Sequence, residues 1–190
     1  MDRGPWDDDP RGLGLVLDEG RGSLPYALIH GEALVACAAW ALGESGVDLV
    51  DASVTWSGVA ESGEDFVLHD SLCPMTPPDF IATCLDRART TGSVVVGVRP
   101  VTDTVKVVER DRVGRTIDRV DLVAITSPLV IPAHVVAQLS QQPSADLARA
   151  VADLAAAGHQ VDRALAPTEG RRVFSVEDVT VLDGLTTGRG

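Results

Sequence analysis

The chain alternates between short runs of β-branched, apolar residues and segments whose apolar residues recur at helical spacing. Strands are predicted at residues 13–17, 47–54, 66–69, 93–98, 122–125, 161–166 and 172–174, and the continuous β-branched run at 93–98 indicates a strand that is buried on both faces. Helices are predicted at residues 34–42, 78–89, 132–141 and 145–157, with a last helix capped by Ser175. Alternation of strands and helices over the whole length predicts an α/β fold with a doubly wound, mostly parallel sheet.

Three stretches depart from this pattern or refine it. Residues 104–109 and 115–118 alternate and carry charge, with DRVG between them, so we expect an antiparallel pair that projects from the sheet as an arm. Residues 55–65 have no periodicity and are expected to form a loop without a helix, whereas helical spacing places Trp40 on a buried face. The expected organisation is a mobile acidic tail at 1–12, a single domain at 13–185 and a short tail at 186–190.

Two of the predicted strands stop at an aspartate. Asp70 follows the run at 66–69, and Asp103 follows the run at 93–98, with a predicted helix between the two strands. Because parallel strands end at one edge of a sheet, we expect both carboxylates at that edge. On the pattern alone, Asp70 is better explained as a cap of the turn before Pro74.

The first strand leads into the glycine-rich turn DEGRGS. Its residues Gly20, Gly22 and Ser23 could bring backbone N–H groups to a phosphate, as nucleotide-binding turns do. The match is weak, and a loop that only reverses the chain explains it equally well.

Composition narrows the range of partners. With 16 basic and 28 acidic residues the net charge is −12, so neither nucleic acid nor an anionic membrane is expected as a partner. Three cysteines without a C-x-x-C pair indicate reduced thiols, and hence a cytoplasmic protein. No apolar run approaches the length of a membrane span.

Four separated motifs carry a family resemblance: HDSLCP at 69–74, PVTDTVK at 100–106, TIDR at 116–119 and RRVFSVEDV at 171–179. In this order they resemble the 2-C-methyl-D-erythritol 4-phosphate cytidylyltransferases of non-mevalonate isoprenoid synthesis. The resemblance implies a Rossmann-like nucleotidyltransferase fold and a homodimer formed through the arm. It also implies transfer of CMP from CTP to methylerythritol phosphate, with release of pyrophosphate and with Mg²⁺ holding the triphosphate.

The resemblance assigns roles to several residues. Asp70 matches the aspartate that holds the metal ion, and Arg172 stands in place of a cationic lysine near the transferred phosphate. The sugar-phosphate positions fall in or near the arm and the strand that follows it, at Asp103, Thr104, Arg119 and Thr126.

The departures from the family lie on the nucleotide side. Tyr26 occupies the position of the catalytic lysine, and Asp18 and Glu19 add negative charge to a shortened phosphate loop. A second nucleotide motif between the second and third strands has no counterpart. The cations left for catalysis are Arg21 and Arg172.

Three hypotheses remain open from the sequence. The chain is a diverged family member with degenerate or absent activity, an active cytidylyltransferase with a rebuilt nucleotide loop, or a non-catalytic dimer that binds a sugar phosphate or a protein partner. Tyr26 favours the first or third, and the intact PVTDTVK motif favours the second or third.

Overall fold

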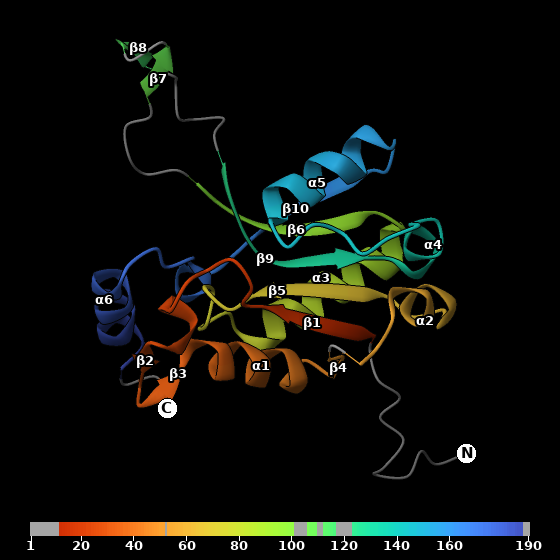
Figure 1. Ribbon diagram of the computed structural model, residues 1–190, viewed down its shortest axis with the longest axis horizontal. Helices are drawn as coiled ribbons and strands as arrows, with labels where there is room; N and C mark the ends of the chain where they lie inside the picture. Colours follow the sequence, from red (N-terminus) through yellow and green to blue (C-terminus); the bar gives the residue numbers. More distant parts are fainter. Residues whose placement is uncertain (1–11, 52, 101–105, 110–111, 117–122, 188–190) are drawn as a thin grey trace.

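The computed structural model describes residues 12–51, 53–100, 106–109, 112–116 and 123–187. Its main sheet has the strand order β10-β6-β9-β5-β1-β4 (Figure 1). These strands are β1 (Leu13–Leu17), β4 (Asp48–Leu49), β5 (Phe66–Asp70), β6 (Val94–Pro100), β9 (Val123–Ile131) and β10 (Val161–Leu165). Only the two pairs that β9 makes, with β5 and β6, are antiparallel among the pairings of this sheet in the described residues. The prediction of an α/β fold with a mostly parallel sheet is confirmed.

Helices cover both faces of the sheet (Figure 1). One layer holds α1 (Leu34–Glu44) and α3 (Pro78–Thr91), and the other holds α2 (Trp56–Glu61), α4 (Ala133–Val136) and α5 (Leu147–Ala156). Strand β5 is buried on both sides, because Phe66 and Leu68 pack with the second layer while Val67 packs with the first. Strand β6 is also buried on both sides, since Val94 and Val96 pack with the second layer and Val95 with the first, as its continuous β-branched run predicted.

A third cluster lies beside the sheet, at the end of the molecule that carries the C-terminal helix. There α6 (Val176–Thr186) packs against the hairpin of β2 (Leu28–Ile29) and β3 (Glu32–Ala33) (Figure 1). The short turns η1 (Leu24–Tyr26) and η3 (Thr168–Gly170) complete the described elements. Ser175 caps α6 as predicted, since its hydroxyl accepts a hydrogen bond from the Asp178 N–H at 3.2 Å.

Several local predictions were wrong. The stretch expected to be a loop contains α2, because Thr55 caps it and Trp56 packs edge-on against Phe66, with ring centroids 5.3 Å apart. Trp40 is 62% exposed instead of buried. The strand expected at 47–54 has only two residues, the helix expected at 132–141 has four, and no strand forms at 172–174.

The predicted arm is confirmed as a two-stranded antiparallel sheet of β7 (Lys106–Glu109) and β8 (Arg112–Thr116), separate from the main sheet (Figure 1). The expected DRVG turn was wrong, because β8 already begins at Arg112. The expected boundaries of the domain and its tails remain predictions. Within the described part of the chain, no helix combines the length and apolar character needed to cross a membrane.

Candidate functional site

Asp70 lies at the carboxyl end of β5, next to the end of β1, where Leu17 is its partner in register. Its backbone N–H donates a 2.6 Å hydrogen bond to the Ser127 hydroxyl on β9, so three strands fix the position of this residue. Asp70 is 3% exposed. The predicted position of Asp70 at this edge of the sheet is therefore confirmed, whereas that of Asp103 stays a prediction.

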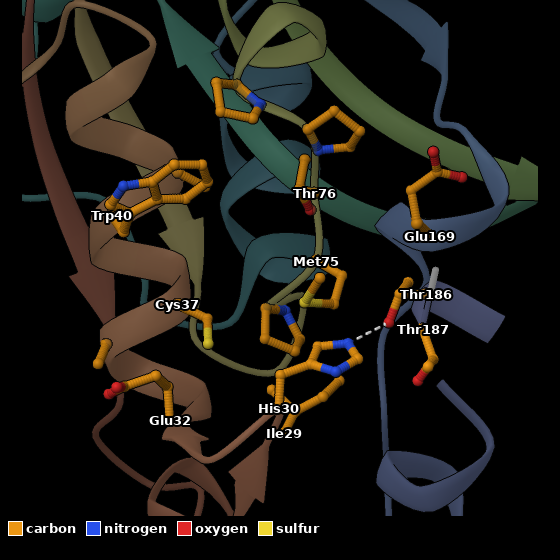
Figure 2. A pocket seen from close by; sticks show the side chains of 15 residues that line it. Ile29, His30, Glu32, Cys37, Trp40, Met75, Thr76, Glu169, Thr186 and Thr187 are labelled. Carbon is orange, nitrogen blue, oxygen red and sulfur yellow. Dashed lines mark hydrogen bonds between the residues drawn. The ribbon is translucent and has the colours of Figure 1, made fainter. Parts of the chain in front are cut away.

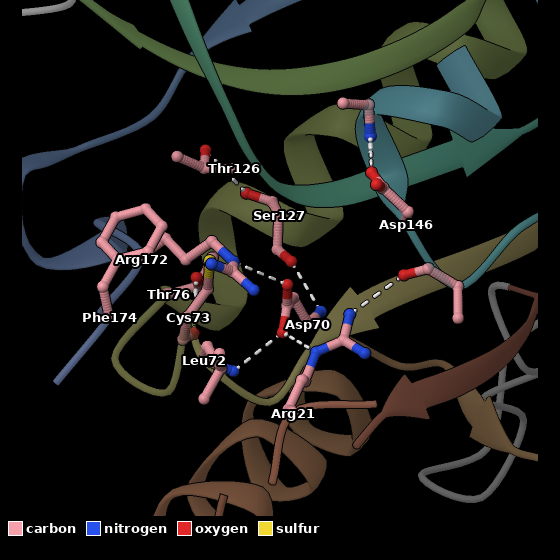
Figure 3. Close-up of polar contacts among 12 residues, drawn as sticks. Arg21, Asp70, Leu72, Cys73, Thr76, Thr126, Ser127, Asp146, Arg172 and Phe174 are labelled. Atoms are coloured by element: carbon pink, nitrogen blue, oxygen red, sulfur yellow. Dashed lines mark hydrogen bonds and ion pairs between the residues drawn. The ribbon is translucent and has the colours of Figure 1, made fainter. Parts of the chain in front are cut away.

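Both carboxylate oxygens of Asp70 are occupied by protein donors (Figure 3). Oδ1 accepts hydrogen bonds from Arg21 Nε at 2.6 Å and from the Leu72 N–H at 3.0 Å, and Oδ2 accepts one from Arg172 Nε at 3.0 Å. Burial by itself would raise the pKa of Asp70, but the hydrogen bonds from Arg21, Leu72 and Arg172 outweigh it and the pKa is lowered. The bond to Leu72 is the turn cap that the sequence pattern suggested, and the two arginines come in addition.

Arg21 joins three parts of the chain. Besides its bond to Asp70, one terminal nitrogen donates to the Glu19 carbonyl at 2.6 Å and the other to the Ala145 carbonyl at 3.0 Å. Its side chain is 7% exposed. Arg21 thus ties the glycine-rich turn to the end of β5 and to the segment before α5, and this leaves little of its charge accessible to a ligand.

Arg172 makes a different use of its guanidinium group. Its Nε donates to Asp70, and its planar head lies 4.9 Å from the centroid of the Phe174 ring. No described residue accepts a hydrogen bond from its terminal nitrogens, and its side chain is 28% exposed. The two contacts fix the plane of the guanidinium group while its outer edge stays available.

Arg21, Asp70 and Arg172 line a cleft of about 660 Å³. Gly20 and Thr126, two other predicted site residues, line it as well. The remaining lining comes mainly from β9 and the start of α5, at Glu19, Val123, Ile125, Ala145, Asp146, Leu147, Ala148 and Phe174. The structure therefore brings five of the predicted residues together in one cleft.

The other predicted residues are not among those that line the cleft. Gly22 and Ser23 are exposed, and Tyr26 is 62% exposed with its hydroxyl 3.4 Å from Asp18 Oδ2. The proposed sugar-phosphate positions Asp103, Thr104 and Arg119 lie outside the described residues.

Mg²⁺, which the resemblance implies, does not fit the residues present. A carboxylate that accepts three N–H donors, two of them cationic, has little capacity left for a hard cation. Nowhere among the described residues do three His, Cys, Asp or Glu side chains group closely enough to hold a metal ion. Instead, two guanidinium groups and one carboxylate give this cluster a net positive charge, which suits an anion.

Sequence reasoning missed several contributors to the cleft. Phe174 was expected within a strand, the Ala145 carbonyl carries no sequence signal, and Ser127 could have been suspected only as a hydroxyl beside Thr126. Asp146 is the cap of α5, since its carboxylate accepts from the N–H groups of Ala148 at 2.9 Å and Arg149 at 3.2 Å.

Cys73, which replaces an arginine of the family motif, is buried and inert. Burial, together with the nearby charge of Asp70, raises the pKa of its thiol to about 12. A thiol in this environment is structural and not reactive.

A larger cavity of about 840 Å³ lies between α1, the segment before α3, and the end of α6 (Figure 2). Its lining includes Cys37, Trp40, Met75 and Thr186, and none of the residues predicted for the functional site. The predicted site residues that come together therefore do so in the smaller cleft.

Comparison with known proteins shows which family this chain resembles. The family model of 2-C-methyl-D-erythritol 4-phosphate cytidylyltransferase matches residues 45–172. The bifunctional enzyme IspD/IspF of Clavibacter michiganensis is 36% identical over 129 residues, which cover 66% of this chain and 28% of that protein. The 2-C-methyl-D-erythritol 4-phosphate cytidylyltransferase of Rhodococcus jostii is 35% identical over 71 residues, or 37% of this chain and 31% of that enzyme. The chain thus matches about a third or less of the length of these relatives.

Solved structures agree in fold. The crystal structure of 2-C-methyl-D-erythritol 4-phosphate cytidylyltransferase from Thermus thermophilus superposes with a TM-score of 0.66 at 16% identity, covering 90% of this chain and 96% of that one. A crystal structure of 4-diphosphocytidyl-2C-methyl-D-erythritol synthase gives a TM-score of 0.69 at 14% identity, covering 93% and 99%. With the motifs, the fold and the family match together, the chain belongs to the 2-C-methyl-D-erythritol 4-phosphate cytidylyltransferase family.

Proposed function

We propose that this member of the family does not transfer CMP from CTP to methylerythritol phosphate at a rate typical of an enzyme. The observation that carries the proposal is the pairing of both Asp70 oxygens with Arg21 and Arg172. The residue that would hold the metal ion instead pairs with two cations and orients them.

The missing lysine supports the same conclusion. Tyr26 is uncharged at neutral pH, and removal of one well-placed cation from a phosphoryl-transfer site costs on the order of a thousandfold in rate. Arg21 is a poor replacement, because all three of its nitrogens already donate within the protein and its side chain is 7% exposed. Asp18 and Glu19 add repulsion toward a triphosphate in the same turn.

A release assay for pyrophosphate tests the proposal. The purified protein is incubated with CTP, methylerythritol phosphate and Mg²⁺, beside the Thermus thermophilus enzyme as a positive control. We expect no release above the blank, even at micromolar protein. Tyr26→Lys is expected to stay inactive, because Asp70 remains paired with both arginines in that variant. Turnover on the order of one per second by the unaltered protein would contradict the proposal.

A second candidate function is the binding of a phosphorylated ligand without turnover. The available edge of the Arg172 guanidinium in the cleft favours it. The remaining alternative is an active enzyme that uses Arg21 and Arg172 as its cations. Pyrophosphate release in the same assay would distinguish this enzyme from the two inactive candidates.

The proposal also covers the oligomeric state and the cellular location of the protein. We expect a homodimer held by the arm of β7 and β8, which sedimentation as a monomer at micromolar concentration would exclude. A cytoplasmic location agrees with the free thiols of Cys37, Cys73 and Cys84.

A further inference from the structure

The larger cavity shares no lining residue with the cleft around Asp70. Its volume of about 840 Å³ falls in the range of small-molecule sites, roughly 300–1,000 Å³. Residues of α1 form one wall, and the segment 74–78 and the end of α6 lie across from it (Figure 2). Because Pro74, Pro77 and Pro78 have fixed φ angles, the wall that they form keeps its shape without a ligand.

Trp40 brings an uncovered aromatic ring to this cavity. It lines the cavity and is 62% exposed, and no described residue forms an aromatic or cation–π pair with it. Ala36 and Cys37, which line the cavity from the same helix, are too small to cover the indole. Among aromatic side chains, tryptophan gives the strongest attraction to a cation over its face. The exposed ring therefore suits a positively charged ligand.

Two hydroxyl groups of the lining can only accept hydrogen bonds from a ligand. Thr76 donates its proton to the Cys73 carbonyl at 2.9 Å, and Thr187 donates its proton to the Asp183 carbonyl at 2.7 Å. Each hydroxyl is left with oxygen lone pairs. These groups suit a ligand that donates hydrogen bonds.

The charged groups of the lining favour a cation. Glu32 and Glu169 line the cavity, and no Lys or Arg stands among the described residues of its lining. His30 adds little positive charge, because its Nδ1 lies 2.7 Å from Asp183 Oδ1 and its Nε2 lies 2.6 Å from the Thr186 hydroxyl (Figure 2). A cavity with this charge balance attracts cations and repels anions.

Glu32 is the carboxylate on which the argument for a cation rests. Within the described part of the chain its carboxylate has no hydrogen-bond or ion-pair partner. It lies on the same side of the cavity as Cys37 (Figure 2), and its charge, together with burial, raises the pKa of that thiol. Trp40 stands about one helical turn after Cys37 on α1. The carboxylate and the indole therefore flank the same part of the cavity.

We propose that this cavity binds an organic ammonium ion with an apolar body. The ammonium group contacts the Trp40 ring and the Glu32 carboxylate, and the apolar body lies against Met75 and the prolines of the opposite wall. The site goes beyond the proposed function and does not rest on it, since the two sites have no lining residue in common. The result of the pyrophosphate assay therefore leaves this proposal unchanged.

Three probes that carry the same phenyl group test the proposal: phenethylamine, which is a cation at about pH 7, phenethyl alcohol, which is neutral, and phenylacetate, which is an anion. Each is titrated calorimetrically into the full chain. We expect the amine to bind about tenfold more tightly than the alcohol, and the anion to give no heat of binding. The affinity for the amine should fall as NaCl is added, because Glu32 is exposed. Equal affinities for the amine and the alcohol, or no heat from the amine at millimolar concentration, would overturn the proposal.

Variants of exposed residues identify the site at which the amine binds. Glu32→Gln should weaken binding of the amine about threefold to fivefold and leave binding of the alcohol unchanged. Glu61→Gln, at an exposed position of α2 outside the cavity, is the matched control and should bind the amine like the unaltered protein. Trp40→Ala should weaken binding of the amine by about threefold or more. A melting temperature close to that of the unaltered protein confirms that each variant is folded. Amine binding that is unchanged in both Glu32→Gln and Trp40→Ala would refute the proposal.

Discussion

We predict that the free energy of unfolding decreases in mild acid because of His69. It is fully buried in β5, next to Asp70, and neither ring nitrogen has a hydrogen-bond partner among the described residues. Burial lowers the pKa of His69 to about 4 from an ordinary value of 6.5, although the nearby charge of Asp70 acts in the opposite direction. Folding therefore requires the neutral imidazole.

The size of the effect follows from the two pKa values. The pKa of His69 is lower in the folded state than in the unfolded state. The free energy of unfolding is therefore undiminished above pH 6.5 and decreases as the pH falls toward about 4. Each pKa unit corresponds to about 1.4 kcal/mol, so the full loss is roughly 3 kcal/mol. At about pH 5, where the unfolded imidazole is mostly charged and the folded one is not, the loss is about 2 kcal/mol.

Urea unfolding at about pH 8 and about pH 5 measures this loss. The unaltered protein should lose about 2 kcal/mol more between the two pH values than His69→Leu, a change to an apolar side chain of similar volume. Comparing the two proteins cancels the contributions of other titrating groups. His134→Gln, at an exposed helix position, is the matched control and should follow the unaltered protein. Equal losses in the unaltered protein and His69→Leu would refute the reasoning and would mean that the folded state accommodates the charged imidazole.

Three further predictions concern the packing. Gly97→Ala should destabilise the protein by about 1–3 kcal/mol in urea unfolding, because a Cβ at this position would collide with the Ser127 carbonyl oxygen; a loss near zero would show that β9 can move away. In thiol labelling of the native protein above neutral pH, half-buried Cys37 should react first, while Cys73 should react only on unfolding; early labelling of Cys73 would contradict its burial. Trp40→Ala should change the free energy of unfolding by less than about 1 kcal/mol, and a loss typical of a core tryptophan would restore the interpretation made from the sequence.

The strands and the long helices could be predicted because their signal is local. Strand β6 reads as a continuous apolar run, and α3 begins at Pro78 and ends at Thr91, just before Gly92, whose φ is 70°. Helix α2 was missed because tertiary contacts stabilise it. The Trp56 indole N–H donates a hydrogen bond to the Leu139 carbonyl at 2.8 Å, and these two residues are far apart in sequence. The exposure of Trp40 was missed for a related reason, since helical spacing cannot tell which apolar face the rest of the chain leaves uncovered.

Three residues of the candidate site could be predicted from the sequence, but their pairing could not. Asp70, Arg21 and Arg172 were each singled out, yet the sequence suggested a metal ligand and two free catalytic cations. Their sequence separations of 49 and 102 residues hide the ion pairs that give them a different role. Only the three-dimensional arrangement shows that one carboxylate serves both arginines.

The most direct test of this account is a crystal structure of the protein grown with CTP and Mn²⁺, with anomalous scattering used to locate the metal. The account predicts that Asp70 keeps its hydrogen bonds to Arg21 and Arg172 and that no manganese peak lies within bonding distance of its carboxylate. A manganese ion bound to Asp70, with either arginine turned away toward the phosphates of CTP, would contradict it.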